Sequence, residues 1–361
     1  MLSMSYIDKK IWILRNKLRL LSLPKNKRIR LEIKTDGRHL TYILVSLHSM
    51  GYGVHIVGSQ MLFRELLCLR KSSPIPFIFG GKKVICGFVI SDIIELINRA
   101  CPERLPLLLM EYDFFNCTKD GNRMPYFMHP SVYHGGHHIR PLLDPKTERL
   151  VKLGFFGTRD AAFYTMNFHF PILNREEILE VLFDNYESEI DIVKSPVSRW
   201  SKHRIAVSLD CKGGDHSTKA FMPLSEYLKA LEACDFFLSP PGCVMPISHN
   251  LIEGMACGSI PVINSSDYLF PKLQNGLNCL SFSTKEELKS ALEAVLAMPP
   301  EKVKMMRTNV IRYYNDHLKP GCWLPKDFKN SKESILVNAE EVSVSKIAYK
   351  DSSQLQRSAL L

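Results

Sequence analysis

The sequence lacks several patterns that would assign a chain to a class at once. None of its ten cysteines forms a C-x-x-C pair, so neither a zinc knuckle nor a thioredoxin-like motif is indicated. No apolar run approaches the roughly 20 residues that a membrane-spanning helix needs. Basic residues interrupt the N-terminal apolar segment, which argues against a secretory signal sequence. Internal repeats and low-complexity tracts are also absent, so the 361 residues are predicted to form a globular protein.

Cysteine usage and charge narrow the class further. Most cysteines lie in apolar stretches such as KKVICGFVI, where a reduced thiol packs as a small hydrophobe. This usage favours a cytoplasmic setting. The net charge is +10, but the first 30 residues hold nine Lys and Arg and a single Asp. Because the rest of the chain is nearly neutral and carries no visible nucleic-acid motif, we expect no nucleic-acid partner.

Residues 1–24 alternate basic and apolar side chains at helical spacing, as in YIDKKIWILRNKLRLLSL. A basic amphipathic helix of this kind can lie on an anionic membrane surface. The alternative is a terminal helix that packs on its own domain. The sequence therefore predicts a cytoplasmic protein, and peripheral membrane attachment through residues 1–24 stays open.

Strand-like and helix-like segments alternate through residues 1–145. The predicted strands are RIRLEIK, VHIVG, PFIFG, KVICGFVI and PLLLMEYDF, with amphipathic helical segments between them. This alternation predicts a parallel sheet covered by helices. We interpret the region as a Rossmann-like unit, although the G-x-G-x-x-G dinucleotide fingerprint is absent.

A second alternating series fills residues 146–320, after a loop-rich stretch at 117–150. The sequence thus predicts two Rossmann-like doubly wound α/β domains that face each other across a cleft. Ligands bind at the carboxyl ends of parallel strands, so each domain would contribute one half of a site in this cleft. Residues 321–361 form a tail that contains a helical piece, ESILVNAEEVSVSKIAY, and can pack back on the N-terminal domain.

The most informative stretch is FFLSPPGCVMPISHNLIEGMACGSIPVIN, residues 236–264. It predicts a buried strand, a rigid Pro-Gly loop, a short helix that begins at Ser248, and a second buried strand. His249 and Asn250 fall in the first helical turn, where backbone N–H groups attract phosphate. Glu253 follows one turn later, where a carboxylate would repel phosphate but accept hydrogen bonds from sugar hydroxyls. The stretch therefore suits a phosphorylated, hydroxyl-rich ligand such as a nucleotide sugar.

This stretch resembles the donor-binding region of GT-B glycosyltransferases, and most of all the exostosin-type families. Ser248, Glu253, Gly258 and Pro261 match the pattern of their donor pocket. The resemblance implies a GT-B fold and transfer of a hexose or pentose from a nucleotide-sugar co-substrate to a glycan or glycoconjugate. It also implies that no metal or other cofactor is required.

Two positions depart from the family pattern. Met245 stands where many retaining GT-B enzymes have a first glutamate, and Asn250 stands at the exostosin-type arginine position. Either His249 takes over part of the arginine's role, or the phosphate binds elsewhere. A CMP-linked donor has one phosphate and needs fewer cations, so a Kdo-type donor stays an alternative.

Other loops supply further candidates for the donor site. KLGFFGTRD predicts a strand that ends at Gly157, followed by Thr158 and Arg159, which could contact a donor phosphate. Arg175 begins a later helix and is a weaker phosphate candidate. The polar loop CKGGDHSTK either closes over the ligand or moves freely in solvent.

The resemblance implies that residues 146–320 bind the nucleotide-sugar donor and that residues 1–145 bind the acceptor. The catalytic base is therefore expected in the N-terminal domain. Asp36 and His39 follow the first predicted strand, so either could accept a proton from an acceptor hydroxyl; helix entry is the alternative role for Asp36. A histidine-rich stretch, MPYFMHPSVYHGGHHIR, suggests an acceptor-contacting loop or a plain surface loop. No convincing carboxylate or cysteine partner supports a metal site there.

Competing functions follow from the same features. The leading hypothesis is a glycosyltransferase. A second is an enzyme of the same architecture with another reaction, such as an epimerase or phosphorylase, for which no motif is visible. A third is a non-catalytic glycan- or nucleotide-binding module held at a membrane surface by residues 1–24.

Overall fold

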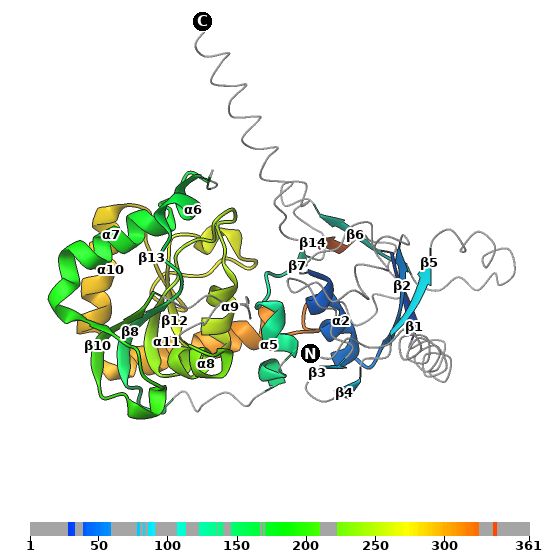
Figure 1. Ribbon diagram of the computed structural model, residues 1–361, viewed down its shortest axis with the longest axis horizontal. Coiled ribbons are helices and arrows are strands. Elements are labelled where there is room, and N and C mark those ends of the chain that lie inside the picture. The colour runs from blue at the N-terminus through cyan, green and yellow to red at the C-terminus, as the bar shows by residue number, and fades with distance from the viewer. Residues whose placement is uncertain are drawn as a thin grey trace, which may run out of the picture.

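The computed structural model shows two lobes that lie side by side, with the helices α5 and α9 between them (Figure 1). The first lobe is built from the N-terminal half and the second from the segment that begins near residue 146. The structure describes residues 28–32, 39–58, 78–79, 82–83, 86–90, 107–112, 123–134, 136–139, 146–166, 168, 170–209, 222–324 and 335–337.

A six-stranded sheet forms the centre of the N-terminal lobe, and all of its pairings are parallel. The order β5-β2-β1-β6-β14-β7 begins with the 3-2-1-4 arrangement of Rossmann-like folds. Its strands are β1 (Arg28–Glu32), β2 (Gly53–Gly58), β5 (Cys86–Ile90), β6 (Leu107–Tyr112), β7 (Arg123–Met124) and β14 (Ile335–Val337). A separate antiparallel pair consists of β3 (Ile78–Phe79) and β4 (Lys82–Lys83).

Helix α2 (His39–Ser49) follows β1 and carries an apolar segment that is almost wholly buried. It packs against α5 (Pro130–His134), which is followed by the 3-10 turn η2 (His137–Ile139). The ring of Tyr42 in α2 stacks between Phe127 and Trp323, so segments far apart in the sequence share one aromatic cluster. This cluster lies where α2 meets the segment that returns from the C-terminal lobe.

A second six-stranded sheet, also wholly parallel, forms the C-terminal lobe. Its order is β13-β12-β11-β8-β10-β9, and the short edge strand β9 extends the 2-1-3-4-5 order of a doubly wound sheet. The strands are β8 (Val151–Phe156), β9 (Ile190–Ile192), β10 (His203–Ser208), β11 (Cys234–Leu238), β12 (Ile260–Ile263) and β13 (Leu280–Ser281). The central strands are buried on both faces, as parallel strands between helical layers must be.

Helices cover both faces of this sheet. Right-handed crossovers place α7 and α10 together on one face, and α8, α9 and α11 on the other. An Asn174–Glu177 capping box starts α7, and Thr284 caps α10. The bounds are α6 (Ala161–Met166), α7 (Arg175–Tyr186), α8 (Leu224–Glu232), α9 (His249–Ala256), α10 (Lys285–Ala297) and α11 (Pro300–Tyr313). Single turns are η3 (Glu187–Glu189), η4 (Val197–Arg199) and η5 (Ser266–Tyr268), and a π-helical turn, η6 (Tyr314–Leu318), extends α11.

A buried arginine ties the far end of this lobe together. The Arg149 guanidinium donates to the carbonyls of Cys234 and Cys257, at 2.7 and 2.9 Å, and to the Ser259 hydroxyl at 3.1 Å. Burial lowers its pKa to about 10. These bonds hold the start of β11 against the end of α9, where Gly258 has φ +73 and reverses the chain into β12.

The C-terminal segment leaves the second lobe and contacts the first. The Tyr42 hydroxyl donates to the carbonyl of Leu318 at 2.9 Å, and the Trp323 indole donates to the Ser46 hydroxyl at 3.0 Å. Farther along, β14 pairs with β6 on one side and β7 on the other. The helix expected over ESILVNAEEVSVSKIAY is therefore wrong at residues 335–337, which form a strand inside the N-terminal sheet.

Two parallel sheets with the predicted alternation confirm the α/β, Rossmann-like fold class. The five cysteines whose side chains are described, Cys234, Cys243, Cys257, Cys279 and Cys322, all have free thiols, and Cys234, Cys257 and Cys279 are buried. Within the described ranges, no helix combines the length and the apolar character needed to cross a bilayer. Residues 1–24, Asp36 and the loop CKGGDHSTK lie outside the described residues.

Candidate functional site

The site is centred on the point where the chain order of the C-terminal sheet reverses. After β8 the chain continues to β9 and β10 on one side, and β11 and β12 then follow on the other. Neighbouring parallel strands whose crossovers leave in opposite directions open a space beyond their carboxyl ends. The segments that border this switch point are 157–160 after β8 and 239–247 after β11.

Helix α9 begins directly after the second of these segments. Ser248 occupies the N-cap position, as the sequence predicts, but its hydroxyl does not cap the helix. It donates instead to the Pro240 carbonyl at 3.2 Å and contacts the Asn250 side-chain oxygen. Ser248 therefore connects the loop after β11 to the first turn of α9. Because its hydroxyl is used in this way, it does not cap the amide groups of that turn.

Glu253 lies one turn into α9 and is 3% exposed. Its Oε1 accepts the backbone N–H of His129 at 2.9 Å, and its Oε2 accepts the Tyr227 hydroxyl at 2.9 Å. Burial raises the pKa of this carboxyl above its ordinary value, and the two hydrogen bonds partly oppose that rise. Because His129 belongs to the N-terminal lobe and Tyr227 to α8, Glu253 connects three parts of the fold.

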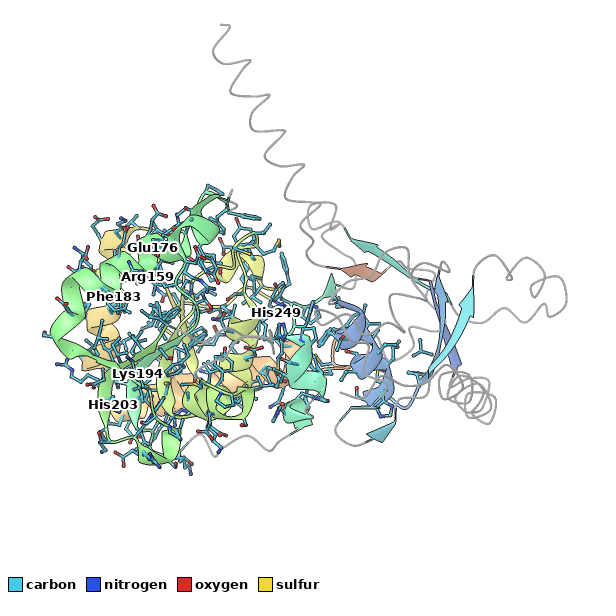
Figure 2. All side chains as sticks on the ribbon, viewed as in Figure 1. Arg159, Glu176, Phe183, Lys194, His203 and His249 are labelled. Carbon is cyan, nitrogen blue, oxygen red and sulfur yellow. The ribbon has the colours of Figure 1, made fainter. Side chains whose placement is uncertain are left out.

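His249 joins the same lobe contact. Its Nδ1 lies 2.8 Å from the Phe127 carbonyl, which can only accept, so Nδ1 carries a proton and donates. The ring stacks on Tyr126 at 5.2 Å and meets the His129 ring edge-on at 5.5 Å. The N-terminal residues of α9 thus lie at the junction of the two lobes, where Figure 2 places His249.

Arg175, at the start of α7, holds the two switch-point segments together. It is 5% exposed. Nε and Nη2 donate to the Pro241 carbonyl at 3.1 and 3.0 Å, while Nη1 donates to the Thr158 carbonyl at 3.3 Å. Nη1 also donates to the Tyr164 hydroxyl at 2.8 Å, and the guanidinium lies 4.0 Å from that ring. Arg175 is thus a brace between the loops after β8 and β11.

Arg159 makes an ion pair with Glu176, and its guanidinium lies over the ring of Phe183. The hydrogen bond to Glu176 raises the Arg159 pKa further above its ordinary value. Figure 2 shows Arg159, Glu176 and Phe183 together near α7, well apart from His249. The structure therefore does not bring Arg159 to the tip of α9. Gly157 lies nearer the switch point, where an added Cβ would come 3.6 Å from the Arg175 Nη1.

The predicted residues accordingly fall into two groups. Ser248, His249, Asn250 and Glu253 lie together on α9, and Gly157, Thr158 and Arg175 meet at the adjoining loops. His39 is the first residue of α2, and Asp36 lies outside the described residues.

Sequence reasoning did not single out Tyr227, whose contact with Glu253 spans 26 positions. The sequence signal that could have placed Tyr227 near Glu253 was the order of strands and helices. Helices that follow consecutive strands of a doubly wound sheet in the same direction pack side by side, as α8 and α9 do.

The histidine-rich stretch lies partly at this junction. His129 Nδ1 lies 2.7 Å from the Ser131 hydroxyl, while His138 packs against the Tyr133 ring at 5.2 Å. Burial lowers the pKa of His138 to about 4, so it stays neutral near pH 7. The described residues contain no group of three His, Cys, Asp or Glu side chains arranged to hold a metal ion.

Comparison with known proteins gives distant structural likenesses. No protein-family model and no curated protein matches the chain. Among solved structures it is similar to the glycotransferase of kitacinnamycin, with 9% identity, a TM-score of 0.34, and coverage of 81% of this chain and 98% of that chain.

Two further solved structures are Anabaena Alr3699/HepE in complex with UDP and CalG4, the calicheamicin glycosyltransferase. For HepE the identity is 9% and the TM-score 0.39, over 91% of this chain and 100% of that chain. For CalG4 they are 11% and 0.35, over 82% and 95%. Because these identities and TM-scores are low, the fold is established by this chain's own strand order. The likeness to these structures assigns neither a ligand nor an activity to the chain.

Proposed function

We propose that the protein is a glycosyltransferase that moves a hexose or pentose from a nucleotide-sugar donor to a glycan or glycoconjugate acceptor. One observation carries the proposal. The first turn of α9 lies at the lobe junction beside the switch point, and a buried carboxylate follows within that helix. Helix N-termini favour phosphate and carboxylates accept sugar hydroxyls, so the two halves of a nucleotide sugar each have a matching group.

The donor would lie with its phosphate at the amide groups of residues 248–250 and its ribose at Glu253. Charge that develops on the leaving phosphate would be stabilised by those preorganised N–H groups, which need no reorganisation during the reaction. The acceptor would enter from the N-terminal lobe, with Asp36 or His39 as the base. No metal or other cofactor is assigned a role.

Binding can be tested by thermal melting of the full chain with UDP, GDP and CMP, alone and as sugar conjugates. We expect at least one nucleotide to raise the melting temperature of the wild type and to raise that of Glu253→Gln less. Glu293→Gln, an exposed substitution on α10, is the matched control and should respond like the wild type. Failure of every nucleotide at millimolar concentration would refute the donor assignment.

A specific observation favours a single-phosphate donor as the second candidate. Asn250 stands where the exostosin-type pattern has arginine, Arg175 is occupied by carbonyls, and Arg159 is paired with Glu176. The described part of the switch point therefore offers little cationic charge for a diphosphate. A CMP-linked, Kdo-type donor would then stabilise the protein more than UDP or GDP conjugates, and the same melting panel separates the two donors.

Catalysis can be separated from simple binding by product analysis. We expect Asp36→Asn or His39→Gln to lower kcat at least about 100-fold while donor binding is kept, because general-base catalysis typically contributes 10²–10⁴-fold. A protein lacking residues 1–24 should keep activity on a soluble acceptor. Nucleotide binding without transfer to any acceptor, together with loss of vesicle binding in that deletion, would favour the membrane-surface binding module instead.

A further inference from the structure

Tyr227 and the carboxylate of Glu253 form a contact between neighbouring helices that the proposed function does not use. The Tyr227 hydroxyl, from α8, donates to Oε2 of Glu253 at 2.9 Å. An ionised carboxylate offers about four acceptor positions. Within the described part of the chain, Tyr227 and the His129 N–H fill one on each oxygen, which leaves about two acceptor positions for other donors. A vicinal diol has two hydroxyl groups and matches that remaining capacity.

We propose that Tyr227 is a positioning residue that holds the Glu253 carboxylate as the acceptor of the ribose hydroxyls of the donor. This inference rests on the proposed function. Tyr227 would not touch the ligand; it would act through Glu253 by fixing the direction in which Oε2 presents its second lone pair. The same hydrogen bond joins α8 to α9, two helices that pack against each other.

The surroundings of Glu253 explain why such a residue is needed. The carboxyl is 3% exposed, and burial favours its protonated form, which would donate one hydrogen and lose acceptor capacity. Donation from the Tyr227 hydroxyl and from the His129 N–H favours the ionised form. Among the described residues, the titratable groups that interact with it are Tyr227 from α8 and Tyr133 from α5. His129, before α5, contacts it through the backbone N–H, and His249 lies one turn earlier on α9.

The test is a double-mutant cycle that removes the Tyr227 hydroxyl from the protein and the 2′-hydroxyl from the ligand. Tyr227→Phe removes only the hydroxyl, and calorimetry would compare UDP, GDP and CMP with their 2′-deoxy counterparts. We expect the variant to lose about tenfold or more in affinity for the ribonucleotide that binds, because the Glu253 carboxylate is then no longer held to accept hydrogen bonds from the ribose. The loss for the 2′-deoxy form should stay within about twofold.

A pH series supplies a readout that a purely structural role would not change. Without the Tyr227 hydroxyl the Glu253 carboxyl protonates more readily, so the acid limb of ribonucleotide affinity should move to higher pH in Tyr227→Phe. Tyr186→Phe is the matched control, because its hydroxyl donates to the Lys289 carbonyl at 3.4 Å on the opposite helical layer. Circular dichroism and melting would verify that both variants are folded.

The outcomes separate the two proposals. Equal losses for ribo- and deoxynucleotides, or an unmoved acid limb, would overturn the role of Tyr227 and leave the glycosyltransferase proposal standing. If the wild type binds none of the nucleotides, both proposals fall together. A selective loss for the ribonucleotide with a shifted acid limb supports both.

Discussion

At the residue scale, Glu253 combines features that rarely occur together without a functional reason. It is a buried carboxylate on an otherwise apolar helical face, and the Tyr227 hydroxyl and the His129 N–H, which donate hydrogen bonds to it, are both neutral. Desolvation of a charge costs free energy unless polar partners replace the lost water. A leucine or methionine in this place would pack without that cost, so the carboxylate is better explained by ligand binding than by stability.

The raised pKa of Glu253 makes a prediction about stability. A carboxyl whose pKa rises on folding binds its proton more tightly in the native than in the unfolded chain. The wild type should therefore lose stability as the pH rises from the ordinary value of 4.5 through the raised native value. Glu253→Gln has no carboxyl to titrate, so its unfolding free energy should gain on that of the wild type across this window.

Urea unfolding at a series of pH values, from about 4.5 to about 8, would measure the difference. Glu293→Gln is the control, because this side chain is exposed on α10. Its difference from the wild type should stay nearly constant with pH. An equally constant difference for Glu253→Gln would contradict the assigned burial of a titrating carboxyl.

At the element scale, Arg175 determines how the loops after β8 and β11 are spaced. Its planar fork satisfies two carbonyl groups and a tyrosine hydroxyl at once, which an ammonium group cannot reproduce. The sequence pattern suggested a phosphate ligand at this position. The guanidinium is instead occupied by the protein, so its contribution to a ligand would pass through the loops.

We expect Arg175→Lys to lower the unfolding free energy by about 2–4 kcal/mol, because it leaves buried carbonyls unpaired. Hydrogen exchange should accelerate first in residues 157–159 and 242–243, because Pro240 and Pro241 carry no amide hydrogen. Arg199→Lys, at an exposed position in η4, should change neither quantity measurably. Unchanged exchange in the two loops of Arg175→Lys would show that the brace is not needed.

The elements that the sequence predicted well are those with one strong local signal. The strands β8, β11 and β12 are mostly apolar and buried, and α9 has a polar residue before it and Gly258 after it. Two strands had no such signal. β9 has an exposed Ile192 at a sheet edge, and β14 is short and lies in a polar tail. Their pairing depends on partners far away in the sequence, which periodicity cannot reveal.

The candidate site divides in the same way. The clustering of Ser248, His249 and Glu253 follows from helical spacing alone and was predictable. Their contacts were not, because the Phe127 carbonyl and the His129 N–H come from the other lobe, more than 100 positions away. Arg159 shows the opposite case. Its loop suited a phosphate, but the first turn of α7 brings Glu176 to it.

At the scale of the whole molecule, the two lobes are held by contacts of three kinds. α9 meets residues 127–129, the π-helical turn η6 meets α2 through Tyr42, and the tail places β14 within the N-terminal sheet. Because the C-terminal segment crosses back to the N-terminal lobe, it links the two lobes in addition to the contacts of α9. The donor groups on α9 and the acceptor side would therefore be positioned by one connected structure.

The tail contact can be tested with two truncated proteins. One ends after Val337 and keeps β14, and the other ends after Leu324 and lacks it; both lack residues 338–361. Loss of β14 removes the partner of β7 and leaves one edge of β6 unpaired, so we expect the shorter protein to melt at least about 4 °C lower and to aggregate more readily. Identical melting of the two would show that β14 contributes little.

The measurement that tests the central claim most directly is a crystal structure of the full chain soaked with UDP, GDP and CMP. The account predicts nucleotide density at the first turn of α9, with phosphate near residues 248–250 and ribose hydroxyls within hydrogen-bond distance of Glu253. Nucleotide bound at any other place, or no nucleotide density at the first turn of α9 at saturating concentration, would contradict it.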